Sequence, residues 1–189
     1  MEKLLSSLSF GGILSEMDIQ LFASCFKEKI MKTGDFFLEY NDIAREIAFL
    51  EKGILRMYSP SIDGSEITKY FIREGQFTVD LESYYAVKAS TESIQAVTNT
   101  VIFTIGKSEI EKLSKEIPNL YIYIKTITEM SLLNKIKDND FLHFGDAKTK
   151  YREFLRRYPD LALQVPQQYV ASYLKITSQS LSRIRREIK

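Results

Sequence analysis

Residues 165–189 read VPQQYVASYLKITSQSLSRIRREIK and carry the strongest structural signal in the chain. The first half predicts a short helix that begins after Pro166, a residue suited to a helix start. Apolar side chains recur at helical spacing on one face of it: Val170, Tyr173 and Leu174. Ala171 is small enough to let a second helix approach closely. Lys175–Thr177 then predicts a tight turn.

The second half predicts another helix over residues 178–188. Thr177 can cap it by accepting backbone N–H groups. Three apolar residues face inward at spacings of three and four: Leu181, Ile184 and Ile188. Another face is polar and basic: Ser178, Gln179, Ser182, Arg183 and Arg186. This arrangement is typical of a helix-turn-helix, whose second helix enters the DNA major groove. The alternative is an amphipathic helical pair that only packs.

The charge distribution supports a polyanionic partner for this end of the chain. The net charge of the 189 residues is only +1. From Ala147 onward there are ten basic and three acidic residues, a balance of +7, whereas residues 1–146 carry 16 basic and 22 acidic residues, a balance of −6. A basic module on an acidic body suggests nucleic acid as the partner. An ordinary solvated surface is the alternative on charge alone.

The preceding part of the chain predicts an antiparallel β structure. Between residues 29 and 105, short β-branched and aromatic runs alternate with turn signals. Asp63–Gly64 is the clearest hairpin signal and joins 55–59 to 66–72. Two more strands are expected at 94–97 and 101–105. Many short strands at near-regular spacing indicate a closed or double-layered sheet.

Helices are expected on both sides of these strands. Residues 1–28 show helical spacing, and Ser15 can cap a helix through Phe26. Ser108 is expected to open another helix. The segment 118–141 has a wide apolar face, of which one stripe can pack on the β body and the rest on a partner helix. Burial of this helix wholly within its own chain is the alternative. Asp146 can cap a helix over 147–158, which Pro159 is expected to close.

Together these features resemble the CRP/FNR family of transcription regulators. The family's run of a polar residue, two others, Gly or Ser, Arg and an aliphatic residue is matched by Gln179, Ser182, Arg183 and Ile184. Glycine-punctuated segments resemble its cyclic-nucleotide-binding roll: 33–35, 49–54, 63–64 and 75–77. The resemblance covers essentially the whole chain.

The resemblance implies an α+β fold with three parts. Residues 1–117 would form an antiparallel double-stranded β-roll, or jelly roll, with N-terminal helices. Residues 118–141 would form a long helix that pairs with its twin in a homodimer. Residues 142–189 would form the helix-turn-helix DNA-binding domain, which in this family often carries a wing.

The family's phosphate-binding cassette is degenerate in this chain. Members that bind cyclic nucleotides use a Gly-Glu pair, to which Val79 and Asp80 align here. They also place an Arg against the phosphate, where this chain has Ser90 and Thr91, followed by the acidic Glu92. A buried phosphate without a cation keeps most of its desolvation penalty. We therefore expect no binding of cyclic AMP or cyclic GMP through these contacts.

The resemblance also suggests how DNA would be bound. The expected base-reading residues are Ser178, Gln179, Ser182 and Arg183. Arginine can bind guanine O6 and N7, and glutamine can bind adenine N6 and N7. The expected backbone contacts are Gln167, Lys175, Thr177 and Arg186. Lys175 stands where the family commonly has glycine, and a lysine at positive φ there costs about 1 kcal/mol.

Composition limits the other functions. One cysteine, Cys25, and one histidine, His143, do not supply a cysteine-rich zinc site, an iron–sulfur cluster or the several histidines of a cupin enzyme. We therefore expect no cofactor and no enzyme activity. No apolar run approaches the ~20 residues of a membrane helix and no signal-peptide profile is present, so the cytoplasm is expected.

Two further partners remain open. An unknown small-molecule or lipid effector, distinct from cyclic AMP, would make DNA binding conditional, and aromatic residues near the cassette allow an apolar ligand: Phe77, Tyr84 and Tyr85. If the protein activates transcription, RNA polymerase would be a partner too.

Overall fold

The computed structural model describes residues 1–143 and 145–188, except for the side chain of Asn139. Lys189, counted above among the basic residues, and Phe144 lie outside the described residues. The chain forms two compact units: Met1–Met57 with Phe71–Thr128, and Tyr58–Tyr70 with Glu129–Lys189. The expected division after residues 117 and 141 stays a prediction.

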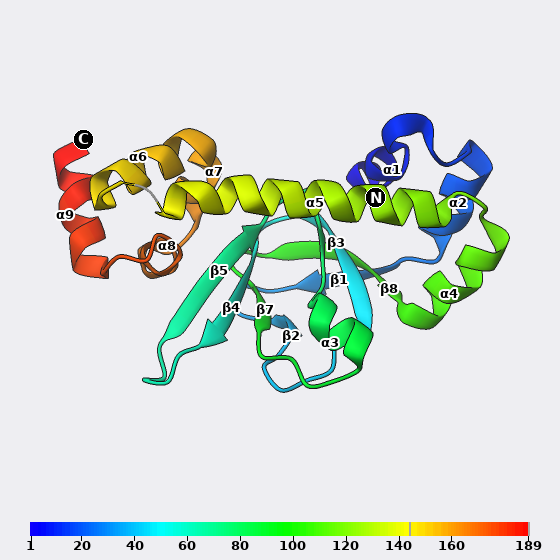
Figure 1. The fold of residues 1–189 in the computed structure, drawn as a ribbon, viewed down its shortest axis with the longest axis horizontal. Helices are drawn as coiled ribbons and strands as arrows, with labels where there is room; N and C mark the ends of the chain where they lie inside the picture. The colour runs from blue at the N-terminus through cyan, green and yellow to red at the C-terminus, as the bar shows by residue number, and fades with distance from the viewer. Residues whose placement is uncertain (144, 189) are drawn as a thin grey trace. The chain divides into compact units, whose positions relative to one another are not determined.

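The fold is α+β, as predicted, with two four-stranded sheets (Figure 1). The strand orders are β1-β8-β3-β6 and β2-β7-β4-β5. The strands are β1 (Lys27–Met31), β2 (Phe36–Leu38), β3 (Glu46–Lys52), β4 (Leu55–Pro60), β5 (Glu66–Ile72), β6 (Phe77–Thr78), β7 (Ser93–Ala96) and β8 (Thr100–Gly106). Strand β8 runs antiparallel to both β1 and β3, and β2 runs antiparallel to β7.

The β4–β5 hairpin confirms the strongest turn signal. Its loop is longer than a two-residue turn, because the N–H of Ser61 donates to the carbonyl of Ser65 at 2.7 Å. Within the loop, residues 61–65, only Gly64 adopts a positive φ, of 80°. Asp63 accepts hydrogen bonds from the Ser65 hydroxyl at 2.7 Å and the Ser65 N–H at 3.0 Å, and these bonds lower the pKa of its carboxyl.

The N-terminal helices are α1 (Glu2–Leu8), a 3₁₀ turn η1 (Phe10–Gly12) and α2 (Glu16–Ser24). Ser15 caps α2 in a reciprocal capping box with Asp18, as expected for a helix start. The expectation of helix as far as residue 28 is wrong, because β1 begins at Lys27 and pairs with β8. The paired residues lie 69 to 77 apart along the chain, so no local pattern predicts this strand.

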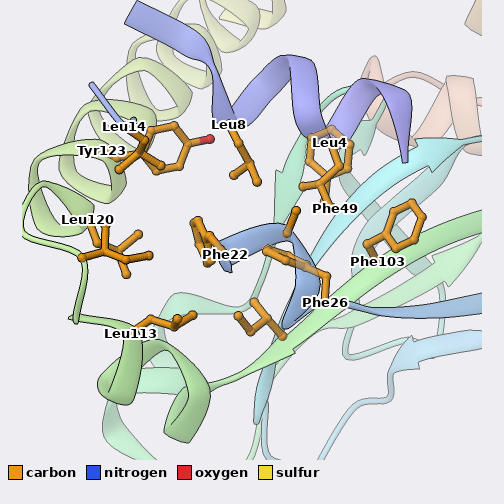
Figure 2. Packing of buried hydrophobic residues seen from close by; sticks show 13 residues of the cluster. Leu4, Leu8, Leu14, Phe22, Phe26, Phe49, Phe103, Leu113, Leu120 and Tyr123 are labelled. Atoms are coloured by element: carbon orange, nitrogen blue, oxygen red, sulfur yellow. The ribbon is translucent and has the colours of Figure 1, made fainter. Parts of the chain in front are cut away.

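The core of the first unit joins these helices to the roll. Figure 2 shows side chains from α1, α2, β3, β8 and the start of α5 meeting in one cluster. Tyr123 is buried in it and its hydroxyl donates to the carbonyl of Ser7 at 3.1 Å. Cys25 is half-buried and packs against this cluster, consistent with a structural thiol.

The remaining helices are α3 (Leu81–Ala86), α4 (Lys107–Glu116), α5 (Leu120–His143), α6 (Ala147–Arg157), α7 (Pro159–Gln164), α8 (Gln167–Tyr173) and α9 (Ser178–Ile188). None of the described helices is long and apolar enough to cross a bilayer. Helix α4 begins one residue before Ser108, with Gly106 at its cap. Pro159 starts α7 instead of only closing α6, because proline at a first helical position loses no hydrogen bond. The regular secondary structure of residues 145–188 is helical, and no strand of a wing lies among these described residues.

Helix α5 is apolar on more than one side. Leu120 and Tyr123 near its start are buried. Farther along, three large apolar side chains are more than half exposed: Leu132 (58%), Leu133 (55%) and Ile136 (51%). The alternative of a helix wholly buried in its own chain is therefore wrong.

Candidate nucleic-acid interface

The turn between α8 and α9 is a Schellman motif. The N–H of Ile176 donates to the carbonyl of Ala171 at 3.0 Å, and the N–H of Lys175 donates to that of Ser172 at 3.1 Å. These two bonds satisfy carbonyls that the end of a helix leaves unpaired. The residue at the left-handed position is Lys175, with φ of 56°. The positive φ expected at this lysine is confirmed.

Thr177 fixes the start of α9. Its hydroxyl accepts the N–H of Ser180 at 3.1 Å and donates to the Ser180 hydroxyl at 2.9 Å. The hydroxyl is thus engaged within the chain, and Thr177 serves as the predicted cap. Its second predicted role, a contact to the DNA backbone, stays a prediction.

Helix α9 buries one face and exposes another. Leu181 and Ile184 are buried, and Ile188 is half-buried. On the outer face, Gln179 and Arg183 are exposed and lie one helical turn apart. Ser178 is exposed beside them and Ser182 is half-buried. The four expected base-reading residues therefore lie in one helix, and the long side chains of Gln179 and Arg183 share one face of it.

The expected backbone contacts surround this helix. Gln167 is exposed in the first turn of α8, and Lys175 is exposed in the turn. Arg186 is exposed in the last turn of α9, where its Nη2 lies 3.5 Å from the Ser182 hydroxyl, the outer limit of a hydrogen bond.

An aromatic cluster of the second unit packs against α8. Phe154 of α6 packs on Tyr173 of α8 with ring centroids 6.0 Å apart, and on Tyr158 at 5.6 Å. Phe141 of α5 contacts the same Tyr173 at 6.1 Å. Such ring pairs add stabilisation beyond their buried area. Asp146 caps α6 by accepting the N–H of Thr149 at 2.8 Å, which lowers the pKa of its carboxyl.

Ion pairs neutralise only some of the basic side chains. Glu153 binds Arg156 and Arg157 at 2.7 and 2.6 Å, and these hydrogen bonds lower the pKa of Glu153 to about 2. Lys148 of α6 binds Glu187 of α9 at 3.1 Å. Within residues 145–188, Lys175, Arg183 and Arg186 belong to no ion pair. Positive charge is therefore available at the turn and on the exposed face of α9.

Two positions of the expected cassette, Asp80 and Ser90, are hydrogen-bonded to each other. Asp80 is buried and caps α3 by accepting the N–H of Ser83 at 3.1 Å. Its other carboxylate oxygen accepts the hydroxyl of buried Ser90 at 2.5 Å. The Ser90 hydroxyl in turn accepts the N–H of Glu92 at 3.0 Å. Val79 is half-buried beside Asp80, whereas Thr91 is exposed. The structure thus brings Asp80 and Ser90 together but leaves Thr91 on the surface.

Sequence analysis missed a buried cation in the first unit. Arg56 of β4 is 1% exposed and donates from Nε and Nη2 to the Gln95 side chain of β7, at 3.1 and 2.6 Å. A single arginine within a strand gives no local sign that its side chain is buried. Only the pairing of β7 with β4 brings Gln95 opposite it.

Two of the three aromatic residues considered for an apolar ligand fill the protein. Phe77 packs on Phe49 with centroids 4.8 Å apart. Tyr84 is buried, which raises the pKa of its hydroxyl to about 12. Tyr85 is 65% exposed and contacts Tyr84 edge to face at 5.3 Å.

Comparisons with known proteins agree with this architecture. Residues 28–116 match the cyclic nucleotide-binding domain family. No curated protein gives a significant sequence match.

Solved structures align over most of the chain. One is described as a transcriptional regulator of the CRP/FNR family from Eubacterium rectale (TM-score 0.73, 16% identity, 96% of this chain and 87% of that one). Another is the c-di-GMP-responsive global regulator CLP of Xanthomonas campestris (0.71, 14%, 92% and 91%). A third is FixK2 of Bradyrhizobium japonicum (0.70, 17%, 86% and 84%). At these identities the similarity establishes the fold.

Proposed function

We propose that this chain, which carries a cyclic nucleotide-binding domain and has the fold of the CRP/FNR regulators, is a homodimeric DNA-binding transcription regulator that needs no cyclic nucleotide. The observation that carries the proposal is helix α9. It is capped by Thr177, joined to α8 by a Schellman turn, and exposes Gln179 and Arg183 on one face.

The chemistry of that face suits base recognition. Arg183 can donate two parallel hydrogen bonds to guanine, and Gln179 can both donate to and accept from adenine. Their i, i+4 spacing directs them toward neighbouring base pairs. Lys175 and Arg186 flank this pair with charges suited to phosphate contacts, which position a protein without specifying sequence.

The exposed apolar residues of α5 support dimerisation. Leu132, Leu133 and Ile136 are more than half exposed, and burying such side chains stabilises by about 1.5–3 kcal/mol each. A second copy of α5 would cover them as in a two-stranded coiled coil. A two-fold dimer would then read an inverted repeat with half-sites about one helical turn apart.

The internal pairing of Asp80 and Ser90 supports independence from cyclic nucleotides. A phosphate at this position would meet a carboxylate whose oxygens already accept two hydrogen bonds. The two anions would repel each other in a region that excludes much of the water. A cyclic nucleotide should therefore bind only weakly at this position.

Selection of purified protein on a random duplex DNA pool, with no effector added and at moderate salt, tests the proposal. We expect enrichment of an inverted repeat. A subsequent titration of that duplex with and without 1 mM cyclic AMP should give the same affinity. Folded protein that enriches no motif would contradict the proposal and favour the alternative, a sensor whose DNA binding depends on another small molecule or a lipid.

A further inference from the structure

Ser172 of α8 connects the DNA-binding helices to the β4–β5 hairpin. Its hydroxyl accepts the N–H of Thr68 at 2.9 Å and donates to the carbonyl of Glu66 at 2.8 Å. Both partners are backbone groups of β5. All three residues belong to the second compact unit, which groups Tyr58–Tyr70 with Glu129–Lys189.

The two bonds satisfy one N–H and one carbonyl of a strand edge. β5 is the last strand of its sheet, so one side of it has no neighbouring strand. The groups that Ser172 binds flank Ile67, and they are the pair that one residue of an adjacent parallel strand would bind. A hydroxyl can do this because it both donates and accepts. Since Thr68 is only 3% exposed, loss of the hydroxyl would leave its N–H poorly solvated.

A second contact holds the same hairpin. The ammonium of Lys135, on α5, lies 4.1 Å from the centroid of the Tyr70 ring, within the range of a cation–π interaction. The hairpin segment 58–70 is thus fixed to both α5 and α8. Its strands continue along the chain into the first unit, through Leu55–Met57 and Phe71–Ile72.

We infer that Ser172 is a positioning residue for DNA binding, which couples the β4–β5 hairpin to the recognition helix. This inference rests on the proposed function. Helices α8 and α9 pack against each other and are joined by the Schellman turn, so a shift of α8 would be passed on to α9. The Ser172 contact leaves Gln179 and Arg183 exposed, so the form that it stabilises can bind DNA.

The inference predicts coupling in both directions. If DNA binds preferentially to the form with the contact made, DNA must strengthen the contact by the same factor that the contact strengthens DNA binding. A residue with a purely structural role would affect stability without this reciprocity.

The test compares Ser172→Ala and Ser172→Thr with the wild-type full chain. Two readouts are used: affinity for the duplex enriched by selection, and amide hydrogen exchange in residues 66–72 with and without that duplex. Ser114→Ala is the matched control, because the Ser114 hydroxyl bonds only to Ile110 in its own helix, α4.

We expect Ser172→Ala to bind DNA about tenfold more weakly, the scale of two lost hydrogen bonds, while Ser172→Thr and Ser114→Ala stay within about twofold of wild type. Exchange at Thr68 should slow when DNA is added to wild type but not to Ser172→Ala. Equal DNA affinity of Ser172→Ala and wild type, or unchanged Thr68 exchange on adding DNA to wild type, overturns the inference alone. Failure of wild type itself to bind any selected duplex overturns the proposed function as well.

Discussion

Replacement of Lys175 by glycine should raise stability while weakening DNA binding. Lys175 holds φ at 56° in the Schellman turn. A side chain in this left-handed conformation costs about 1–2 kcal/mol, and the extra unfolded-state freedom of glycine offsets about 0.5–1 kcal/mol of the relief. The net expectation for Lys175→Gly is about 0.5–1 kcal/mol of added stability.

No described interaction of the Lys175 side chain opposes this gain. Lys175 is exposed and, within the described residues, has no ion-pair partner to lose. Both hydrogen bonds of the turn are backbone bonds and survive the substitution. For a chain of this length the gain corresponds to a rise of about 1–4 °C in Tm.

DNA binding should respond in the opposite direction. If the Lys175 ammonium contacts one phosphate, its removal lowers the slope of log K against log salt by about 0.9. Fluorescence anisotropy on a labelled selected duplex between 50 and 300 mM salt measures that slope. Urea unfolding measures stability on the same samples.

Lys175→Ala separates the two effects, because alanine removes the charge but keeps the strain of a side chain at positive φ. We expect it to share the reduced salt slope of Lys175→Gly without the gain in stability. A Lys175→Gly protein that is less stable than wild type would refute the strain argument. An unchanged salt slope in both variants would refute the phosphate contact.

Three further predictions follow from the second unit. Arg183→Ala should cost about 1–3 kcal/mol of binding free energy and relax discrimination at one guanine, measured by repeating the selection, whereas an equal loss on all sequences would make Arg183 a phosphate contact. Leu133→Asp together with Ile136→Asp should abolish the dimer in sedimentation velocity without unfolding the protein, because both side chains are more than half exposed, and a dimer that persists would exclude α5 as the interface. Glu153→Gln should be less stable than wild type above pH 4.5, and the difference in stability should vanish as the pH falls toward 2. The reason is that hydrogen bonds from Arg156 and Arg157 lower the pKa of Glu153 to about 2, so the side chain stabilises the fold only while it is ionised. Urea unfolding across that pH range checks the last prediction, and a difference that grows on acidification contradicts it.

Local signals predicted the helix-turn-helix well. The cap at Thr177, the turn at Lys175 and the inward spacing of Leu181 and Ile184 all act within a few residues, so sequence alone specifies them. The Ser15 capping box and the β4–β5 hairpin were predictable for the same reason.

Long-range pairing set the limit of prediction. Lys27–Met31 is a strand only because β8 lies beside it. Helix α3 was missed for a different reason: its cap, Asp80, is a local signal, but the resemblance treated that residue as a cassette position. Arg56 and Ser172 gave no local signal, since their partners lie 39 and 104 or more residues away. The interactions between residues farthest apart in the sequence were therefore the ones least visible in it.

Two serine hydroxyls make internal hydrogen bonds that bear on how the proposed function is controlled. The Ser90 hydroxyl donates to the Asp80 carboxylate, and the Ser172 hydroxyl binds two backbone groups of β5, the N–H of Thr68 and the carbonyl of Glu66. Because these polar groups already have hydrogen-bond partners within the chain, they do not need a ligand as a partner. Occupancy of a DNA site would then depend on how much dimer is present. Below the dimer dissociation constant, DNA binding should rise with the square of the protein concentration, and a first-order rise at every concentration would contradict control through dimerisation.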